Sequence, residues 1–131
     1  MQNVFPGLRY RDARAAIDWL GRAFGYVEHM VVDGVNGKVT HAELTLGEGR
    51  MVMLSSEGDD RYGSHAGTGW SYVVVDDPDG LCERARAAGA EIVQELIDTD
   101  YGSRDFSVRD PEGNLWSFGT YHPLQEQGGA S

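Results

Sequence analysis

The sequence predicts an α+β fold made of two βαβββ modules, whose strands form a concave half-barrel sheet with the helices on its outer face. Three observations support this prediction. A helical pattern from Asp12 to Gly25 returns from Asp76 to Gly89, at an offset of 64 residues. The same offset relates E-G-R-M-V-M-L (Glu48–Leu54) to E-G-N-L-W-S-F (Glu112–Phe118). Around these motifs, short runs alternate apolar and polar residues as strands do.

The first module opens with a strand over Val4–Tyr10, followed by a helix. Asp12 can cap the start of this helix, and Gly25 can end it in a left-handed conformation. Apolar residues recur at helical spacings of three and four, at Ala13, Ala16, Ile17, Leu20 and Phe24. Three further strands are expected over Tyr26–Asp33, Thr40–Leu46 and Arg50–Ser55, with G-V-N-G as the first turn between them.

The second module follows the same plan. A strand over Trp70–Val75 precedes a helix over Pro78–Ala88, where proline is tolerated in the first turn. The turn D-P-E-G has proline at its second position and glycine at its fourth, as a tight turn favours. The remaining strands are expected over Glu91–Ile97, Arg104–Arg109 and Asn114–Thr120.

The chain of 131 residues suits one domain over residues 1–131. We expect module 1 at about residues 4–55, a glycine-rich linker at 56–69, module 2 at about 70–122 and a flexible tail at 123–131. One helix covers one face of each four-stranded sheet, so the other face stays open. The two open faces together predict a concave ligand site.

Composition limits the function classes. The net charge of −10 disfavours nucleic acid, whose phosphates require lysine and arginine. It would attract a cationic ligand, but a well-solvated surface is the preferred explanation of this charge. The single cysteine, Cys82, allows no intrachain disulfide and no cysteine-based zinc site. With no long apolar segment and no basic N-terminal region, we expect a soluble cytoplasmic protein without a membrane partner.

The early motif R-Y-R-D-A-R-A-A-I-D-W-L-G-R-A-F-G and the late motif D-P-E-G-N-L-W-S-F-G resemble the vicinal oxygen chelate superfamily. That superfamily contains glyoxalase I, bleomycin-resistance proteins and extradiol dioxygenases, and the resemblance runs from about Val4 to His122. It implies a homodimer. It also implies four possible metal-ligand positions, on the first and fourth strands of each module, which are usually His or Glu in metal-dependent members.

Carried over one at a time, those positions fall on Phe5 (or Pro6, if the strand slips by one residue), Met53, Trp70 and Ser117. Ser117 stands where a metal-binding glutamate would be expected. None of these side chains is a good ligand for zinc, nickel or iron. The resemblance therefore predicts a member that has lost its metal and needs no cofactor.

Strand alternation predicts which residues line the cavity. Trp70 and Tyr72 could stack on a planar ligand, and flexible methionines adapt to irregular shapes. The expected ligand-binding residues are Phe5, His41, Glu43, Met51, Met53, Trp70, Tyr72, Tyr101, Arg104 and Ser117. Tyr101 and Arg104 are expected at the cavity mouth, where Arg104 could form an ion pair with an anionic group of the ligand. The alternatives are a dimer interface or plain core for Trp70 and the methionines, and solvated loop charge for Arg104.

The first functional hypothesis is a metal-independent binding protein that sequesters an aromatic or cationic antibiotic or metabolite, as bleomycin-resistance proteins do. The alternative is a metal-dependent lyase, isomerase or dioxygenase of the same superfamily. It requires either a new metal site from His41, Glu43 and Asp105, or metal-free proton transfer with His41 as base and Glu43 orienting it. A polar pair on a sheet face is the simpler interpretation of His41 and Glu43. A subunit with a vestigial cavity is a third possibility, and whether catalysis occurs stays open.

Overall fold

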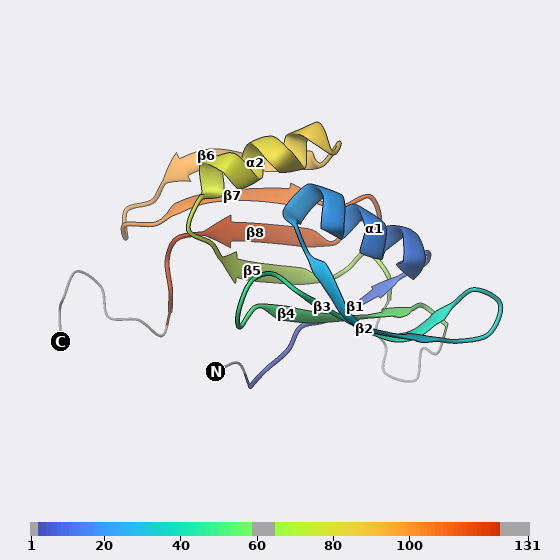
Figure 1. Cartoon of the computed structure of the whole chain (residues 1–131). Coiled ribbons are helices and arrows are strands. Elements are labelled where there is room, and N and C mark those ends of the chain that lie inside the picture. The colour runs from blue at the N-terminus through green and yellow to red at the C-terminus, as the bar shows by residue number, and fades with distance from the viewer. Residues whose placement is uncertain (1–2, 59–64, 124–131) are drawn as a thin grey trace.

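The computed structural model describes residues 3–58 and 65–123 (Figure 1). Part of the predicted linker and nearly all of the predicted tail lie outside these residues. The first module contains β1 (Gly7–Tyr10), α1 (Ala13–Phe24), β2 (Val27–Asp33), β3 (Val39–Thr45) and β4 (Met51–Ser56). The second contains β5 (Trp70–Val74), α2 (Pro78–Ala87), β6 (Glu91–Asp98), β7 (Arg104–Arg109) and β8 (Leu115–Gly119). The α+β fold of two βαβββ modules is confirmed.

The two modules form two four-stranded sheets with matching strand orders, β1-β4-β3-β2 and β5-β8-β7-β6. In each sheet the first strand of the module runs parallel to the last, and the other pairs are antiparallel. Leu8 lies opposite Leu54 in the first sheet, and Ser71 opposite Trp116 in the second. β1 and β5 therefore each form one edge of their sheet, and β2 and β6 form the opposite edges.

The first helix begins and ends where its capping residues predict. The Asp12 carboxylate accepts a hydrogen bond from Ala15 N at 3.1 Å, and Gly25 ends α1 with a φ of 90°. This φ favours glycine because it has no Cβ. At the second helix the cap is Asp77, which accepts from Gly80 N at 3.1 Å, one residue later than the repeat predicts.

The first strand is shorter than predicted, since β1 starts at Gly7 rather than Val4. Pro6 has no N–H to donate to a ladder, so regular pairing cannot extend through it. Its carbonyl still accepts from Met53 N at 2.9 Å. Met51 and Val52 at the start of β4 therefore have no β1 residue opposite them.

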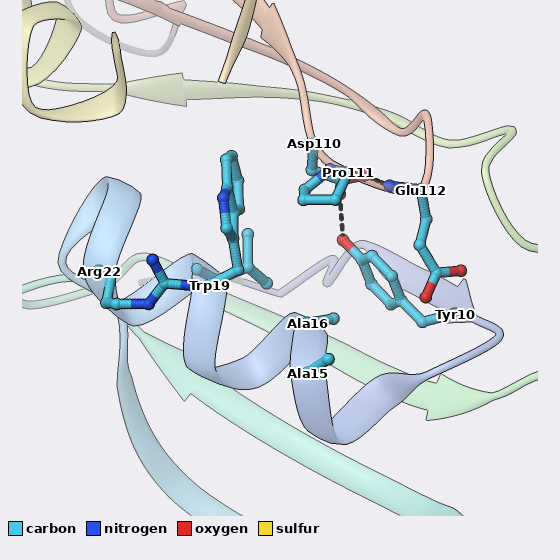
Figure 2. Close-up of a pocket in the computed structure, with 9 residues that line it drawn as sticks. Tyr10, Ala15, Ala16, Trp19, Arg22, Asp110, Pro111 and Glu112 are labelled. Atoms are coloured by element: carbon cyan, nitrogen blue, oxygen red, sulfur yellow. Dashed lines mark hydrogen bonds between the residues drawn. The ribbon is translucent and has the colours of Figure 1, made fainter. Parts of the chain in front are cut away.

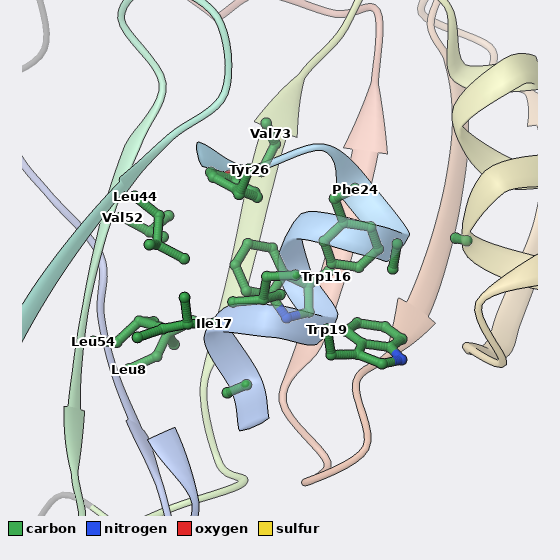
Figure 3. Packing of buried hydrophobic residues seen from close by; sticks show 14 of the residues in the cluster. Leu8, Ile17, Trp19, Phe24, Tyr26, Leu44, Val52, Leu54, Val73 and Trp116 are labelled. Atoms are coloured by element: carbon green, nitrogen blue, oxygen red, sulfur yellow. The ribbon is translucent and has the colours of Figure 1, made fainter. Parts of the chain in front are cut away.

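The two modules share one hydrophobic core on the helix side of the sheets. Phe24 of α1 packs against the second sheet, with ring centroids 5.3 Å from Trp116 and 4.7 Å from Phe118. Figure 3 shows Phe24 and Trp116 together with apolar side chains of the first sheet, namely Leu8, Leu44, Val52 and Leu54. Trp116 and Phe118 are therefore fully buried beneath α1. Among the described residues, no helix has both the length and the apolar character that crossing a bilayer requires.

Candidate functional site

The open face of the first sheet carries the side chains that alternation predicts. Ala42 and Leu44 are fully buried on the helix side, whereas His41 and Glu43 lie on the opposite face of β3. Glu43 pairs with Met53 across the ladder, and Met51 lies on the same face of β4. This face therefore combines flexible thioethers with one carboxylate and one imidazole.

His41 and Glu43 form a close pair on this face. Their Nε2 and Oε2 atoms lie 2.9 Å apart, and both side chains are partly exposed. His29 of β2 is the next nearest cationic candidate, with its Nε2 3.9 Å from Glu43 Oε1. The imidazole and the carboxylate share a hydrogen bond, which holds the two side chains together on the open face.

The open face of the second sheet is aromatic and carries hydroxyl groups. Trp70 is 66% exposed, and its indole N–H donates to Ser117 Oγ at 3.1 Å. Ser117 Oγ in turn lies 2.8 Å from Ser107 Oγ on β7. Ser117 thus holds the indole of Trp70 in place across the sheet and leaves the ring open to solvent.

A second aromatic group lies at the far end of this face. Tyr72 donates its hydroxyl to the Tyr121 carbonyl at 2.7 Å, and Tyr101 donates to Asp105 Oδ2 at 3.2 Å. The Tyr101 and Tyr121 rings meet edge to face at 5.3 Å. Partial burial, with the nearby Asp105 carboxylate, raises the pKa of Tyr72, so this hydroxyl stays protonated as a donor. Sequence reasoning missed Tyr121, because it lies just beyond the last predicted strand.

Two predicted site residues are not brought together with the others. Arg104 points toward the helix side, where Nε and Nη2 donate to the two Asp79 carboxylate oxygens at 2.7 and 3.1 Å. It also lies 3.2 Å from Asp98, and hydrogen bonding from Arg104 lowers the pKa of Asp79. Its charge is therefore already paired. Phe5 lies before β1 and is exposed, outside any strand.

A cavity of about 400 Å³ occupies the gap between the two sheets, and we call it the seam pocket. It is lined by Pro6, Tyr26, residues 48–52, residues 71–74 and His122. Met51 and Tyr72 belong both to this lining and to the predicted ligand-binding set. Within this lining, Arg50 donates a hydrogen bond from Nε to the Val74 carbonyl at 2.6 Å and so links the two sheets.

The side chains at the positions that the resemblance assigns to metal ligands are poor donors for a divalent metal. Met53 offers a thioether and Trp70 an indole, while Ser117 is already bonded to Trp70. Asp105 lies in the second sheet, bonded to Tyr101 and Ser103, and does not join His41 and Glu43. Within residues 3–58 and 65–123, no three His, Cys, Asp or Glu side chains gather in a way that could hold a metal ion.

The D-P-E-G-N turn joins the two modules away from the open faces (Figure 2). Asp110 accepts from the Tyr10 hydroxyl at 2.6 Å and from the Trp116 indole at 3.1 Å. Glu112 accepts from the backbone N–H groups of Arg11 and Asp12 at 2.6 and 2.8 Å, just before α1. A smaller pocket of about 210 Å³ lies beside these contacts, with Trp19 at its wall. This motif is therefore a structural clamp between the end of β1, the start of α1 and β8.

With this geometry in place, comparison with known proteins decides the family. The sequence profile of the glyoxalase/bleomycin resistance protein/dioxygenase superfamily matches residues 4–118. The chain belongs to this superfamily. The uncharacterized protein Rv0887c of Mycobacterium tuberculosis is 36% identical over 129 residues, covering 92% of this chain and 74% of that protein.

Solved structures of the superfamily have the same fold. TioX from Micromonospora sp. ML1 is 37% identical with a TM-score of 0.78, covering 93% of this chain and all of that one (100%). TnmS3 from Streptomyces sp. CB03234, described as an antibiotic binding protein, is 19% identical with a TM-score of 0.71. The matched region covers 90% of this chain and 94% of the TnmS3 chain. At that identity the likeness establishes the superfamily fold alone.

Proposed function

We propose that this chain is a metal-independent small-molecule binding protein that sequesters a planar aromatic ligand, neutral or cationic, such as an antibiotic or a metabolite. The proposal rests mainly on the exposed indole of Trp70, which donates a hydrogen bond to Ser117. By resemblance, these two positions are ones where metal-dependent members of the superfamily place a metal-ligating residue. A large ring that is exposed yet held in one orientation loses little conformational freedom when a ligand stacks on it.

The chemistry of the first sheet supports the same class of ligand. Met51 and Met53 can adapt to an aromatic surface, and Glu43 adds a negative charge to the face. The net charge of −10 attracts a cation and repels an anion at long range. The description of TnmS3 as an antibiotic binding protein fits a shared use of the fold, and we extend it to this chain as part of the proposal.

We further propose that the protein works as a cytoplasmic homodimer whose open faces together enclose the ligand. Large apolar side chains are exposed on or beside these faces in the single chain, among them Met30, Val32, Trp70 and Ile97. Burying such side chains between two copies would remove them from water. Sedimentation equilibrium measures the assembly directly, and a monomer at all concentrations would contradict this part of the proposal.

The test uses proflavine, a planar cation, with binding followed by its own fluorescence. We expect Trp70→Ala to weaken proflavine affinity about ten-fold, because ring stacking and cation–π contact contribute roughly 1–2 kcal/mol. His41→Ala is the matched control on the other sheet and should change affinity less than about two-fold. Equal affinity in the wild type and in Trp70→Ala would overturn the proposal.

The His41–Glu43 pair supports one competing function, metal-free proton transfer, because 2.9 Å is the separation at which a carboxylate can orient a general base. The same two variants separate the hypotheses. If turnover of any compound were found and were lost on His41→Ala while Trp70→Ala retained it, the enzyme hypothesis would replace the binding protein.

A further inference from the structure

Tyrosine side chains surround a carboxylate at the end of the second open face that lies away from Trp70. We call this group the tyrosine cluster, and its members are Tyr72, Tyr101, Asp105 and Tyr121. Every member is accessible to solvent at least in part, and Tyr101 is 58% exposed. Tyr101 donates its hydroxyl to Asp105 Oδ2 at 3.2 Å, and its ring meets the Tyr121 ring at 83°. The two rings therefore form adjoining walls beside the carboxylate, where a ligand can reach them.

Gly119 on β8 allows two members of the cluster to come close together. It lies opposite Asp105 in the ladder, and a Cβ added to it would collide with the Asp105 carboxylate and lie 2.7 Å from the Tyr72 hydroxyl. Gly119 does not have a positive φ, so the position needs a small residue rather than a left-handed backbone. Because both oxygens would touch the same added atom, they lie close enough for one ligand group to contact both.

The negative charge of Asp105 has no cationic partner in the described part of the chain. Its carboxylate accepts hydrogen bonds from the neutral hydroxyls of Ser103 and Tyr101. Within residues 3–58 and 65–123, no Lys, Arg or His side chain forms an ion pair with it. Arg104, the preceding residue, is held by Asp79 on the helix side. A carboxylate can accept about four hydrogen bonds, so Asp105 keeps both its charge and spare acceptor capacity for a ligand.

The chemistry of the cluster selects a cation. Aromatic rings attract cations to their negatively polarised faces, and rings beside a carboxylate are typical of sites for organic ammonium ions. The Tyr121 carbonyl, which accepts from the Tyr72 hydroxyl at 2.7 Å, adds a further electron-rich atom. An anion would be repelled by Asp105 and by the net charge of −10. A calcium ion requires several oxygen ligands around it, whereas an ammonium group uses the carboxylate and the rings together.

We propose that the tyrosine cluster binds an ammonium group of the ligand, whose N–H groups donate to the Asp105 carboxylate while its carbon atoms lie against the tyrosine rings. The inference deepens the proposed function and rests on it, because Trp70 lies on the same open face. Ser117 accepts from the Trp70 indole, and Gly119 follows two residues later on β8, about 7 Å further along the strand. The ligand class is therefore a planar ring with an alkylammonium arm of that reach.

The experiment compares three probes that share a naphthalene ring and a three-carbon arm: 3-(2-naphthyl)propylamine, the matching alcohol 3-(2-naphthyl)propanol, and 3-(2-naphthyl)propanoate. Binding to the full chain is measured by titration calorimetry at pH 7.5, where the amine is charged. We expect the amine to bind at least about five-fold more tightly than the alcohol, and the carboxylate to bind most weakly. An amine that binds no more tightly than the alcohol would overturn the inference, and so would the absence of binding by all three probes.

A variant that removes the charge provides the second readout. Asp105→Asn keeps the shape of the side chain, and it should weaken amine binding about five-fold while changing alcohol binding less than about two-fold. Asp98→Asn is the matched control, because it removes the same charge from an exposed carboxylate that pairs with Arg104. It should change amine affinity less than about two-fold. Equal losses in the two variants would show that the overall charge of the protein attracts the amine, and would overturn the inference.

Two further variants test the rings and the close approach over Gly119. Tyr101→Phe keeps the ring and should hold amine affinity within about two-fold, whereas Tyr101→Ala should weaken it about three-fold. Gly119→Ala changes no charge but displaces the Asp105 and Tyr72 oxygens, so it should also weaken the amine at least about three-fold. Thermal melting followed by circular dichroism shows that each variant is folded. Unchanged amine affinity in both Tyr101→Ala and Gly119→Ala would contradict the proposed geometry.

The outcomes separate this inference from the proposed function. If Asp105→Asn leaves amine affinity unchanged while Trp70→Ala still weakens proflavine binding, the ammonium site is wrong and the proposed function survives. If Asp105→Asn weakens amine binding while Trp70→Ala affects neither proflavine nor the naphthyl probes, ring stacking on Trp70 is wrong. The tyrosine cluster then stands as an ammonium site of its own.

Discussion

Two tryptophans of the second module stand on opposite faces of the same sheet. Trp116 on β8 is 0% exposed, donates its indole N–H to the buried Asp110 and packs against Phe24. Trp70 on β5 is 66% exposed and donates the same group to Ser117 at the same distance, 3.1 Å. Each indole N–H has one partner, but only one of the two rings has a packed environment.

The difference shows how one short motif serves two purposes. In D-P-E-G-N-L-W-S-F-G, the residues facing the helices hold the two modules together, and Ser117 between them faces the open side. Period-two alternation places these roles one residue apart. The helix side is therefore expected to determine stability, and the open side is expected to determine binding.

The largest effect should come from Asp110, which accepts hydrogen bonds from Tyr10, Trp116 and two backbone N–H groups. We expect Asp110→Ala to lower the free energy of unfolding by about 3–5 kcal/mol, since several buried donors lose their acceptor. Urea denaturation followed by circular dichroism measures it. Asp98→Ala, at an exposed carboxylate, should cost less than about 0.5 kcal/mol. A similar loss in both variants would contradict the assigned role of Asp110.

A pH dependence sharpens the same contrast. Burial, and secondarily the Asp110 charge, raise the pKa of Tyr10 far above its ordinary value of about 10. Above pH 10 the unfolded chain releases this proton while the folded chain keeps it, so stability is complete below about pH 10 and falls as the pH rises. The loss attributable to Tyr10 should be about 1.4 kcal/mol per pH unit.

Tyr10→Phe tests this dependence. Between pH 10 and pH 11 the variant should lose less stability than the wild type by about 1 kcal/mol, because the unfolded tyrosine is already half ionised at pH 10; at pH 7 the variant is less stable than the wild type. Urea midpoints measured across this range report the difference. Parallel stability curves for the two proteins would show that Tyr10 ionises equally in both states.

The smallest effect should come from Trp70. At concentrations where the chain is monomeric, Trp70→Ala should change the free energy of unfolding by no more than about 0.5 kcal/mol, because the ring is mostly exposed. Trp116→Ala should cost about 3–5 kcal/mol in the same assay. A core-sized loss at Trp70 in the monomer would break the comparison, whereas a loss that appears only at high concentration would support a dimer.

Much of the fold was predictable because its signals are local. The return of the Asp12–Gly25 pattern 64 residues later predicted two modules, and both are observed. Alternation also placed His41, Glu43, Met53 and Ser117 on the open faces. The start of β1 was misjudged because hydropathy continues through Pro6, where backbone hydrogen bonding cannot.

The site was less predictable because parts of it depend on contacts between distant segments. Arg104 is held by Asp79 of α2, a partner that no pattern within β7 reveals. The seam pocket is lined by residues of both modules, among them Tyr26 and Ser71. Neither residue carries a motif, and only the relative placement of the modules brings them together.

The clamp between Glu112 and the start of α1 also has a consequence for synthesis of the chain. Glu112 accepts hydrogen bonds from Arg11 and Asp12, about one hundred residues earlier in sequence (separations 101 and 100). The ribosome synthesises the N-terminal module first. When α1 emerges, these two N–H groups can bond only to water because Glu112 has not been made, and Phe24 lacks its packing partner Trp116. The first half must therefore wait, incompletely assembled, until nearly the last residues of the second half have left the exit tunnel.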